Sequence, residues 1–204
     1  MMIPSICFVT DPAAPQPVLA QAVAAARGGA GWVQLRDKVL PDAEFAALAR
    51  TLVEALAPYD VPLIVNDRVA VAIEIGAAGL HIGQSDGDPA AIRRRIGPDM
   101  LLGLSIETEA QIAAVPPGID YLGVGPIHAT GSKPDHAAPI GHVGFAKIVS
   151  RTDLPCLAIG GITATDAPAI RAAGGAGLAV ISAISRAPDM ARATRTLRNA
   201  WSDT

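Results

Sequence analysis

The sequence predicts an α/β protein that folds as one single-domain (β/α)₈ TIM barrel over residues 1–204. Half of the residues are hydrophobic but only 3% are aromatic, so Ala, Val, Ile and Leu must build the core, as in buried parallel sheets. Short apolar runs alternate with Ala-rich helical patterns through eight rounds without a linker. An open, doubly wound sheet is the alternative, but it usually has fewer strands and needs a switch point in strand order.

Eight apolar runs rich in Val, Ile and Leu are the predicted strands. In chain order they are ICFVT at 6–10, WVQLR at 32–36, PLIVN at 62–66, GLHIG at 79–83, MLLGLS at 100–105, DYLGV at 120–124, PCLAIG at 155–160 and GLAVIS at 177–182. The predicted helices lie near 17–28, 42–57, 67–76, 89–96, 107–114, 143–150, 164–173 and 189–201. Glycines in GGAGW, GAAGL and GGAGL are expected to end helices in the left-handed conformation and turn the chain into the next strand.

Charge and composition exclude several classes of function. The net charge is −3 and no extended Lys/Arg cluster occurs, so we expect neither a nucleic acid nor a membrane as partner. Cys7 and Cys156 stand alone in apolar strands, which gives no support to a disulfide, zinc or redox site. No targeting segment and no apolar run of about 18 residues is found, so we expect a soluble, cytoplasmic protein.

Polar side chains follow the predicted strands at their carboxyl ends, which lie at the rim where barrel enzymes build their active sites. Gln34, Arg36 and Lys38 alternate along the second strand and its end, so all three share one face. Unpaired charges facing an apolar core would be very costly, so this face must meet water or an anionic ligand. The other polar residues at strand ends are Asn66, Asp67, Gln84, Asp86, Ser105, the segment HATGSKPDH, Gly160, Gly161 and Ser182.

Two anion sites are predicted at this rim. AIGGIT and VISAI end the seventh and eighth strands, where barrels often bind a phosphate through backbone N–H groups. The same GG segment precedes Thr163 and Asp166, which also fit an ordinary helix capping box. The phosphate site and the capping box are therefore both kept as interpretations.

The second predicted site combines the cations Arg36, Lys38 and Lys133 with the carboxylates Asp67 and Asp86. Mg²⁺ held by the two carboxylates would bridge them to phosphate oxygens. A network of salt bridges at the rim explains the same pattern and stays open as the alternative.

The histidines predict no site. His81 lies within a strand and is interpreted as a core residue, while His128, His136 and His142 surround a loop too irregular to define a metal geometry. That loop, 125–142, is long for a compact barrel and is therefore a candidate lid.

Five ordered motifs resemble the thiamine phosphate synthase family over nearly the whole chain. VQLRDK resembles its QLREK segment, and LIVNDRVAVAIEIGAAGLHIGQSD resembles its Asn-Asp strand followed by Gly-Gln-x-Asp. GVGPIHATGSKPDHAAPIG is similar to its Gly-Pro-[IV] and Thr-x-Thr-Lys loop, and AIGGIT and VISAIS complete the order. Several motifs at matching spacing are far more specific than any one of them.

The resemblance implies that a hydroxymethylpyrimidine diphosphate condenses with a thiazole phosphate to give thiamine phosphate and pyrophosphate. It implies Mg²⁺ as cofactor on Asp67 and Asp86, and a homodimer as the assembly. The pyrimidine diphosphate would be held by Gln34, Arg36, Lys38, Asn66, Ser105 and Lys133, of which Arg36, Lys38, Ser105 and Lys133 are the candidate catalytic residues. The thiazole phosphate would be held by Thr130, Ser132, Gly161, Ile181 and Ser182.

Three departures from the family pattern qualify the match. Asp37 stands for a glutamate and Ser132 for the second threonine, and both changes conserve the chemistry. Ile106 and Glu107 stand where the family often has small or polar residues and His, which puts the pocket wall beside Ser105 in doubt.

Two other functions are weighed against the synthase. The related thiazole tautomerase would place its catalytic histidine where this chain has Pro126, although His128 is two positions away. A non-catalytic sensor of thiamine phosphates would keep the pocket, but it would not need every metal and diphosphate position.

Overall fold

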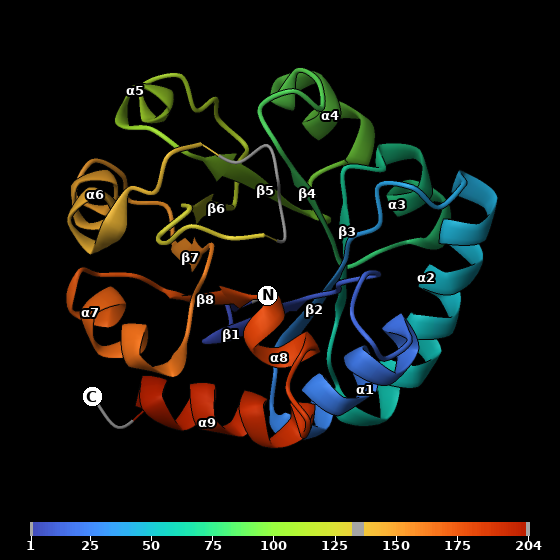
Figure 1. Ribbon diagram of the computed structural model, residues 1–204. Coiled ribbons are helices and arrows are strands. Elements are labelled where there is room, and N and C mark those ends of the chain that lie inside the picture. The colour runs from blue at the N-terminus through green and yellow to red at the C-terminus, as the bar shows by residue number, and fades with distance from the viewer. Residues whose placement is uncertain (1, 132–136, 203–204) are drawn as a thin grey trace.

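Eight parallel strands form a closed barrel in the computed structural model, which describes residues 2–131 and 137–202 (Figure 1). Each strand pairs with its neighbours in sequence, and β8 closes the barrel by pairing with β1. The predicted (β/α)₈ barrel is confirmed and the open sheet is wrong. The strands are β1 Ile6–Val9, β2 Trp32–Leu35, β3 Leu63–Asn66, β4 Gly79–Ile82, β5 Leu101–Ile106, β6 Tyr121–Val124, β7 Cys156–Ile159 and β8 Gly177–Val180.

Helices surround the strands in Figure 1. They are α1 Val18–Gly28, α2 Asp42–Leu56, α3 Val69–Ile75, α4 Pro89–Ile96, α5 Glu109–Ile112, α6 Gly141–Val149, α7 Ala167–Ala172, α8 Ser182–Ser185 and α9 Met190–Ser202, with 3₁₀ turns η1 Ala57–Tyr59 and η2 Ala164–Asp166. All eight predicted helices are present, although α5 is a single turn because Pro116 and Pro117 follow it closely. The short helix α8, which directly follows β8, was not predicted from the sequence.

Both faces of each strand are buried, which explains why the strands read as continuous apolar runs. On β1, Ile6 and Phe8 face the helices, whereas Cys7 and Val9 belong to a separate cluster inside the barrel. Trp32, Ile64, Tyr121, Leu157 and Ala179 complete that inner cluster. The barrel is therefore packed with side chains below its carboxyl rim.

The predicted glycine turns are confirmed. Gly29, Gly76 and Gly174 have φ angles of 94°, 61° and 85°, a region that glycine enters without steric cost. Cys7 and Cys156 are free thiols, and burial raises the pKa of each to about 12. Among the described helices, none combines the length and the apolar character that a membrane span requires.

Candidate active site

A cavity of about 410 Å³ opens at the carboxyl ends of the strands. Every strand contributes to its wall, so the cavity is centred on the barrel axis. The strand residues that line it include Val9, Gln34, Asn66, His81, Ser105, Gly123, Ile159 and Ala179. This is the rim at which the sequence predicted the active site.

The structure brings the predicted site residues together around this cavity. Its lining includes Gln34, Arg36, Lys38, Asn66, Asp67, Gln84, Asp86, Ser105, Thr130, Gly160, Gly161, Ile181 and Ser182. Ser132 and Lys133, which the sequence analysis placed in the same site, lie outside the described residues. Glu107, one of the departures from the family pattern, is also part of the lining.

The segment after β2 is held by hydrogen bonds that the sequence analysis did not foresee. The Arg36 N–H donates to the buried Thr10 hydroxyl over 2.9 Å, and that hydroxyl donates to the Arg36 carbonyl over 3.1 Å. Asp37 Oδ1 accepts from the backbone N–H groups of Val39 and Leu40, so this carboxylate shapes the turn. These bonds hold the backbone that carries Arg36 and Lys38 into the cavity wall.

Asp67 and Asp86 form a carboxyl pair beside a cation. Lys38 Nζ lies 2.9 Å from Asp67 Oδ2, and the Gly83 N–H donates to Asp86 Oδ2 over 2.7 Å. Burial raises the pKa of Asp67 and the hydrogen bond with Asp86 raises it further, which outweighs the lowering effect of Lys38. Burial opposes ionisation of Asp86 too, but its bonds with Asp67 and Gly83 and the charge of Lys38 lower its pKa overall. The pKa values of the two neighbouring carboxyls are therefore shifted in opposite directions.

Asp67 has a φ of 62°, which is uncommon for a residue other than glycine but tolerated by aspartate. Its N–H donates to the His81 carbonyl over 2.9 Å, and its own carbonyl accepts from the Val69 N–H over 3.0 Å. These two bonds fix the left-handed turn between β3 and α3. The turn places Asp67 in the cavity wall beside Lys38.

His81 is a cavity residue as well as a buried one, which corrects its interpretation as core alone. Its Nε2 lies 2.9 Å from the Ser105 hydroxyl, and its Nδ1 lies 3.1 Å from the buried Tyr121 hydroxyl. Gly103 and Gly123 make room for the ring, since a Cβ on Gly103 would lie 2.5 Å from His81 Nδ1. This position could have been predicted from the sequence. Side chains alternate along a strand, so His81 must face the barrel interior when Leu80 and Ile82 face the helices.

Gly160 and Gly161 form the turn after β7, with φ angles of 94° and 66°. A Cβ on Gly160 would lie 2.4 Å from Pro126 Cβ, and one on Gly161 would lie 2.7 Å from His128 Cβ. Only glycine fits this approach between two backbones. The capping box of Thr163 and Asp166 is also present, so that interpretation of the segment is confirmed as local structure.

Comparisons with known proteins agree with the motifs at this rim. The family model described as thiamine monophosphate synthase matches residues 6–184. Relatives called thiamine-phosphate synthase include one from Azorhizobium caulinodans, 47% identical over 85% of this chain and 82% of its own length. Another, from Xanthobacter autotrophicus, is 45% identical over 96% of this chain and 94% of its own length.

A solved structure extends the likeness to the whole barrel. The structure of thiamine phosphate pyrophosphorylase from Pyrococcus furiosus superposes with a TM-score of 0.88 at 32% identity. The match covers 98% of this chain and 96% of that one. The chain therefore belongs to the thiamine monophosphate synthase family.

Proposed function

We propose that this protein is a transferase that joins a hydroxymethylpyrimidine diphosphate to a thiazole phosphate and releases pyrophosphate. Family membership supports this activity, because the curated relatives carry the name of the enzyme that makes thiamine phosphate. The observation that carries the proposal is one cavity with two different ends. Arg36, Lys38 and the Asp67–Asp86 pair stand at one end, and the Gly160–Gly161 turn stands at the other.

The end with the carboxyl pair suits a pyrimidine diphosphate. Arg36 and Lys38 supply positive charge, and Gln34, Asn66 and Ser105 supply neutral donors and acceptors for the ring. Lys133 is the further cation that the sequence motif assigns to this end, although it lies outside the described residues. The diphosphate needs such charge because its leaving group is strongly anionic.

Asp67 and Asp86 fit a divalent cation. The two carboxyls contact each other and offer hard oxygen donors of the kind that Mg²⁺ prefers. When bound, Mg²⁺ would supply positive charge to the pyrophosphate. Lys38, which already lies against Asp67, would then be released toward the phosphate oxygens.

The thiazole phosphate is assigned to the opposite end. Backbone N–H groups of the Gly161 turn, together with Thr130, Ser132, Ile181 and Ser182, are proposed to hold its phosphate. This assignment leaves the thiazole nitrogen free to face the pyrimidine methylene across the cavity. Ser132 lies outside the described residues.

The reaction needs charge neutralisation more than proton transfer. The C–O bond to pyrophosphate breaks with its electron pair on the leaving oxygen, and a resonance-stabilised pyrimidine methyl cation remains. The thiazole nitrogen then donates its lone pair to that carbon. Arg36, Lys38 and Lys133 would stabilise the departing anion, Ser105 would orient the pyrimidine, and loop 125–142 would exclude water.

The tautomerase alternative is not favoured. Pro126 lines the cavity at the position where that relative would need a histidine. His128, the nearest candidate, lies outside the cavity lining and contacts Asp166 over 2.7 Å. The described residues therefore place no histidine from this segment in the cavity wall.

A direct assay tests the proposal. Purified protein with both phosphorylated substrates and Mg²⁺ should form thiamine phosphate and pyrophosphate in equal amounts. The thiazole carboxylate phosphate alone should not isomerise. Isomerisation without synthesis would establish the tautomerase instead, and tight binding of both substrates without any product would establish a sensor. The homodimer stays a prediction, which the mass of the protein in solution tests.

A further inference from the structure

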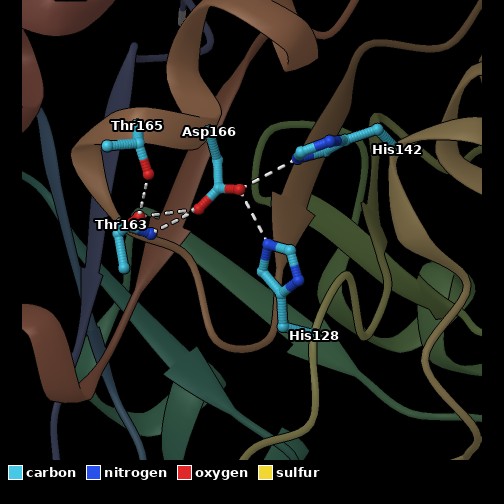
Figure 2. A network of polar contacts seen from close by, with 5 residues as sticks. All are labelled: His128, His142, Thr163, Thr165 and Asp166. Atoms are coloured by element: carbon cyan, nitrogen blue, oxygen red, sulfur yellow. Dashed lines mark hydrogen bonds and ion pairs between the residues drawn. The ribbon is translucent and has the colours of Figure 1, made fainter.

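Three side chains meet outside the cavity lining, at the junction of three segments (Figure 2). His128 follows β6, His142 lies in the first turn of α6, and Asp166 ends η2. His128 Nε2 lies 2.7 Å and His142 Nε2 2.9 Å from the same oxygen, Asp166 Oδ1. No metal geometry was predicted in this region, because the histidines are 38 and 24 residues from Asp166 along the chain.

The carboxylate is held so that one oxygen is directed at the histidines. Asp166 Oδ2 accepts from the Thr163 N–H over 2.8 Å and from the Thr163 hydroxyl over 2.9 Å, as Figure 2 shows. Thr165 supports the Thr163 hydroxyl over 2.8 Å. Partners of this kind orient metal ligands and are worth about 10–100-fold in metal affinity. Thr163 thus orients the carboxylate through Oδ2, while Oδ1 faces the Nε2 atoms of both histidines.

The charge of Asp166 is favoured at neutral pH. Its side chain is 7% exposed, and this burial alone would raise its pKa. Hydrogen bonds from His128, from the backbone and hydroxyl of Thr163, and from His142 outweigh burial and lower the pKa to about 2.

The donor set selects against Mg²⁺. Two imidazole nitrogens and one carboxylate oxygen suit zinc, cobalt or nickel, whereas Mg²⁺ prefers oxygen ligands and keeps several waters. All three donor atoms lie within 4.8 Å of one another. Tetrahedral zinc with bonds of about 2.0–2.2 Å separates its donors by about 3.3–3.6 Å, so both histidine nitrogens would move away from Asp166 Oδ1 and take a similar separation from each other. Their side chains are 45% and 39% exposed, which leaves room for that movement and a path for the ion.

The geometry points to a second metal site, in which His128, His142 and Asp166 bind a divalent transition metal of the zinc class. Water completes the coordination on the exposed side. The site is separate from the proposed Mg²⁺ site, since the cavity lining contains neither histidine. A metal here would link residues near both ends of loop 125–142 to η2. The site lies next to the Gly161 turn, since a Cβ on Gly161 would clash with His128.

Metal binding in the absence of substrates tests the site, so its result is independent of the proposed synthase activity. Protein without a polyhistidine tag is treated with a chelator, then titrated with Zn²⁺ by calorimetry in excess Mg²⁺. One Zn²⁺ per chain should bind, and the melting temperature should rise with the Zn²⁺ concentration. Co²⁺ should give visible absorption bands of a site with nitrogen and oxygen ligands, without the intense near-ultraviolet band of a thiolate ligand.

Substitutions locate the bound ion. Zn²⁺ binding should weaken by at least about tenfold in each of His128→Gln, His142→Gln and Asp166→Asn. Removing a ligand should lower the affinity by more than the roughly 10–100-fold that removal of a supporting partner costs. Asp189→Asn is the matched control, since Asp189 also accepts from a helix N-terminus, through the Arg192 N–H, but lies at the exposed start of α9. It should bind Zn²⁺ as the unchanged protein does.

Two results would overturn the inference. One is a chelator-treated protein that binds no Zn²⁺, because His128 and His142 then only hydrogen bond to Asp166. The other is Zn²⁺ affinity that persists in the double variant His128→Gln/His142→Gln. Where a variant does not fold, the Co²⁺ spectrum of the unchanged protein still decides, since thiolate bands or a lack of any bands would assign the ion elsewhere.

Discussion

Lys38 Nζ lies 2.9 Å from Asp67 Oδ2, and Asp67 in turn hydrogen bonds to Asp86. The cation therefore lies against one member of a carboxyl pair whose pKa values are shifted in opposite directions. A rim salt bridge, the alternative left open by the sequence, is present as a contact. A Mg²⁺ titration of the Asp67→Asn variant tests whether the same carboxyls also bind Mg²⁺.

Asp67→Asn should raise the Mg²⁺ concentration needed for half-maximal turnover by about tenfold or more, because it removes one of two proposed carboxylate ligands. Adding Asp86→Asn should then change little, since the metal is already lost and the two effects are coupled. Mg²⁺ titrations of turnover beside melting curves measure this. Asp88→Asn is the control, because Asp88 caps α4 at the same rim but does not line the cavity. An unchanged Mg²⁺ midpoint for Asp67→Asn would leave only the salt bridge, worth about 0–1 kcal/mol.

Ser182→Asp should weaken binding of the thiazole phosphate far more than binding of the pyrimidine diphosphate. Ser182 begins α8 in the cavity wall, so the new carboxylate would repel an anion bound at the Gly161 turn. Separate Kd measurements for the two ligands give the comparison within one variant. Equal losses for both would contradict the assignment of the two phosphates to opposite ends.

Gly103→Ala should destabilise the fold by about 1–3 kcal/mol through overpacking. The new Cβ would lie 2.2 Å from Tyr121 Cζ and 2.5 Å from His81 Nδ1, and the Tyr121 ring is fully buried in the barrel. Denaturant unfolding measures the loss. Gly131→Ala is the control, because no atom lies within 4 Å of the Cβ it would gain. Equal stability of the two variants would mean that the His81–Tyr121 pair can shift without cost.

Asp166→Asn should lower the free energy of unfolding of chelator-treated protein by about 1–2 kcal/mol at neutral pH. The folded-state pKa of Asp166 is depressed from 3.8 to about 2, so its carboxylate stabilises the fold above pH 4. That contribution is lost as the pH falls from about 4 to about 2. Unfolding curves of both proteins over this range should converge, and a constant difference down to pH 2 would show that the charge of Asp166 contributes nothing.

Composition and the spacing of apolar residues were enough to predict the barrel and most of its rim. Strands with two buried faces are almost entirely apolar, so polar residues near their carboxyl ends, such as Gln34 and Asn66, mark the carboxyl rim. The α8 helix was missed because VISAIS reads as one apolar run, and only packing decides that Ser182 leaves the strand for a helical turn.

Contacts between polar groups of separate βα units could not be predicted from the sequence and are seen only in the folded barrel. His81 lies 24 residues from Ser105 and 40 from Tyr121, and His128 lies 38 residues from Asp166. Local patterns encode the period of a strand or the cap of a helix, as for Thr163 and Asp166, but they hold no information about side-chain distances around a closed barrel. Barrel closure sets those distances, and for this reason the sequence indicated the rim while the structure assembled the clusters on it.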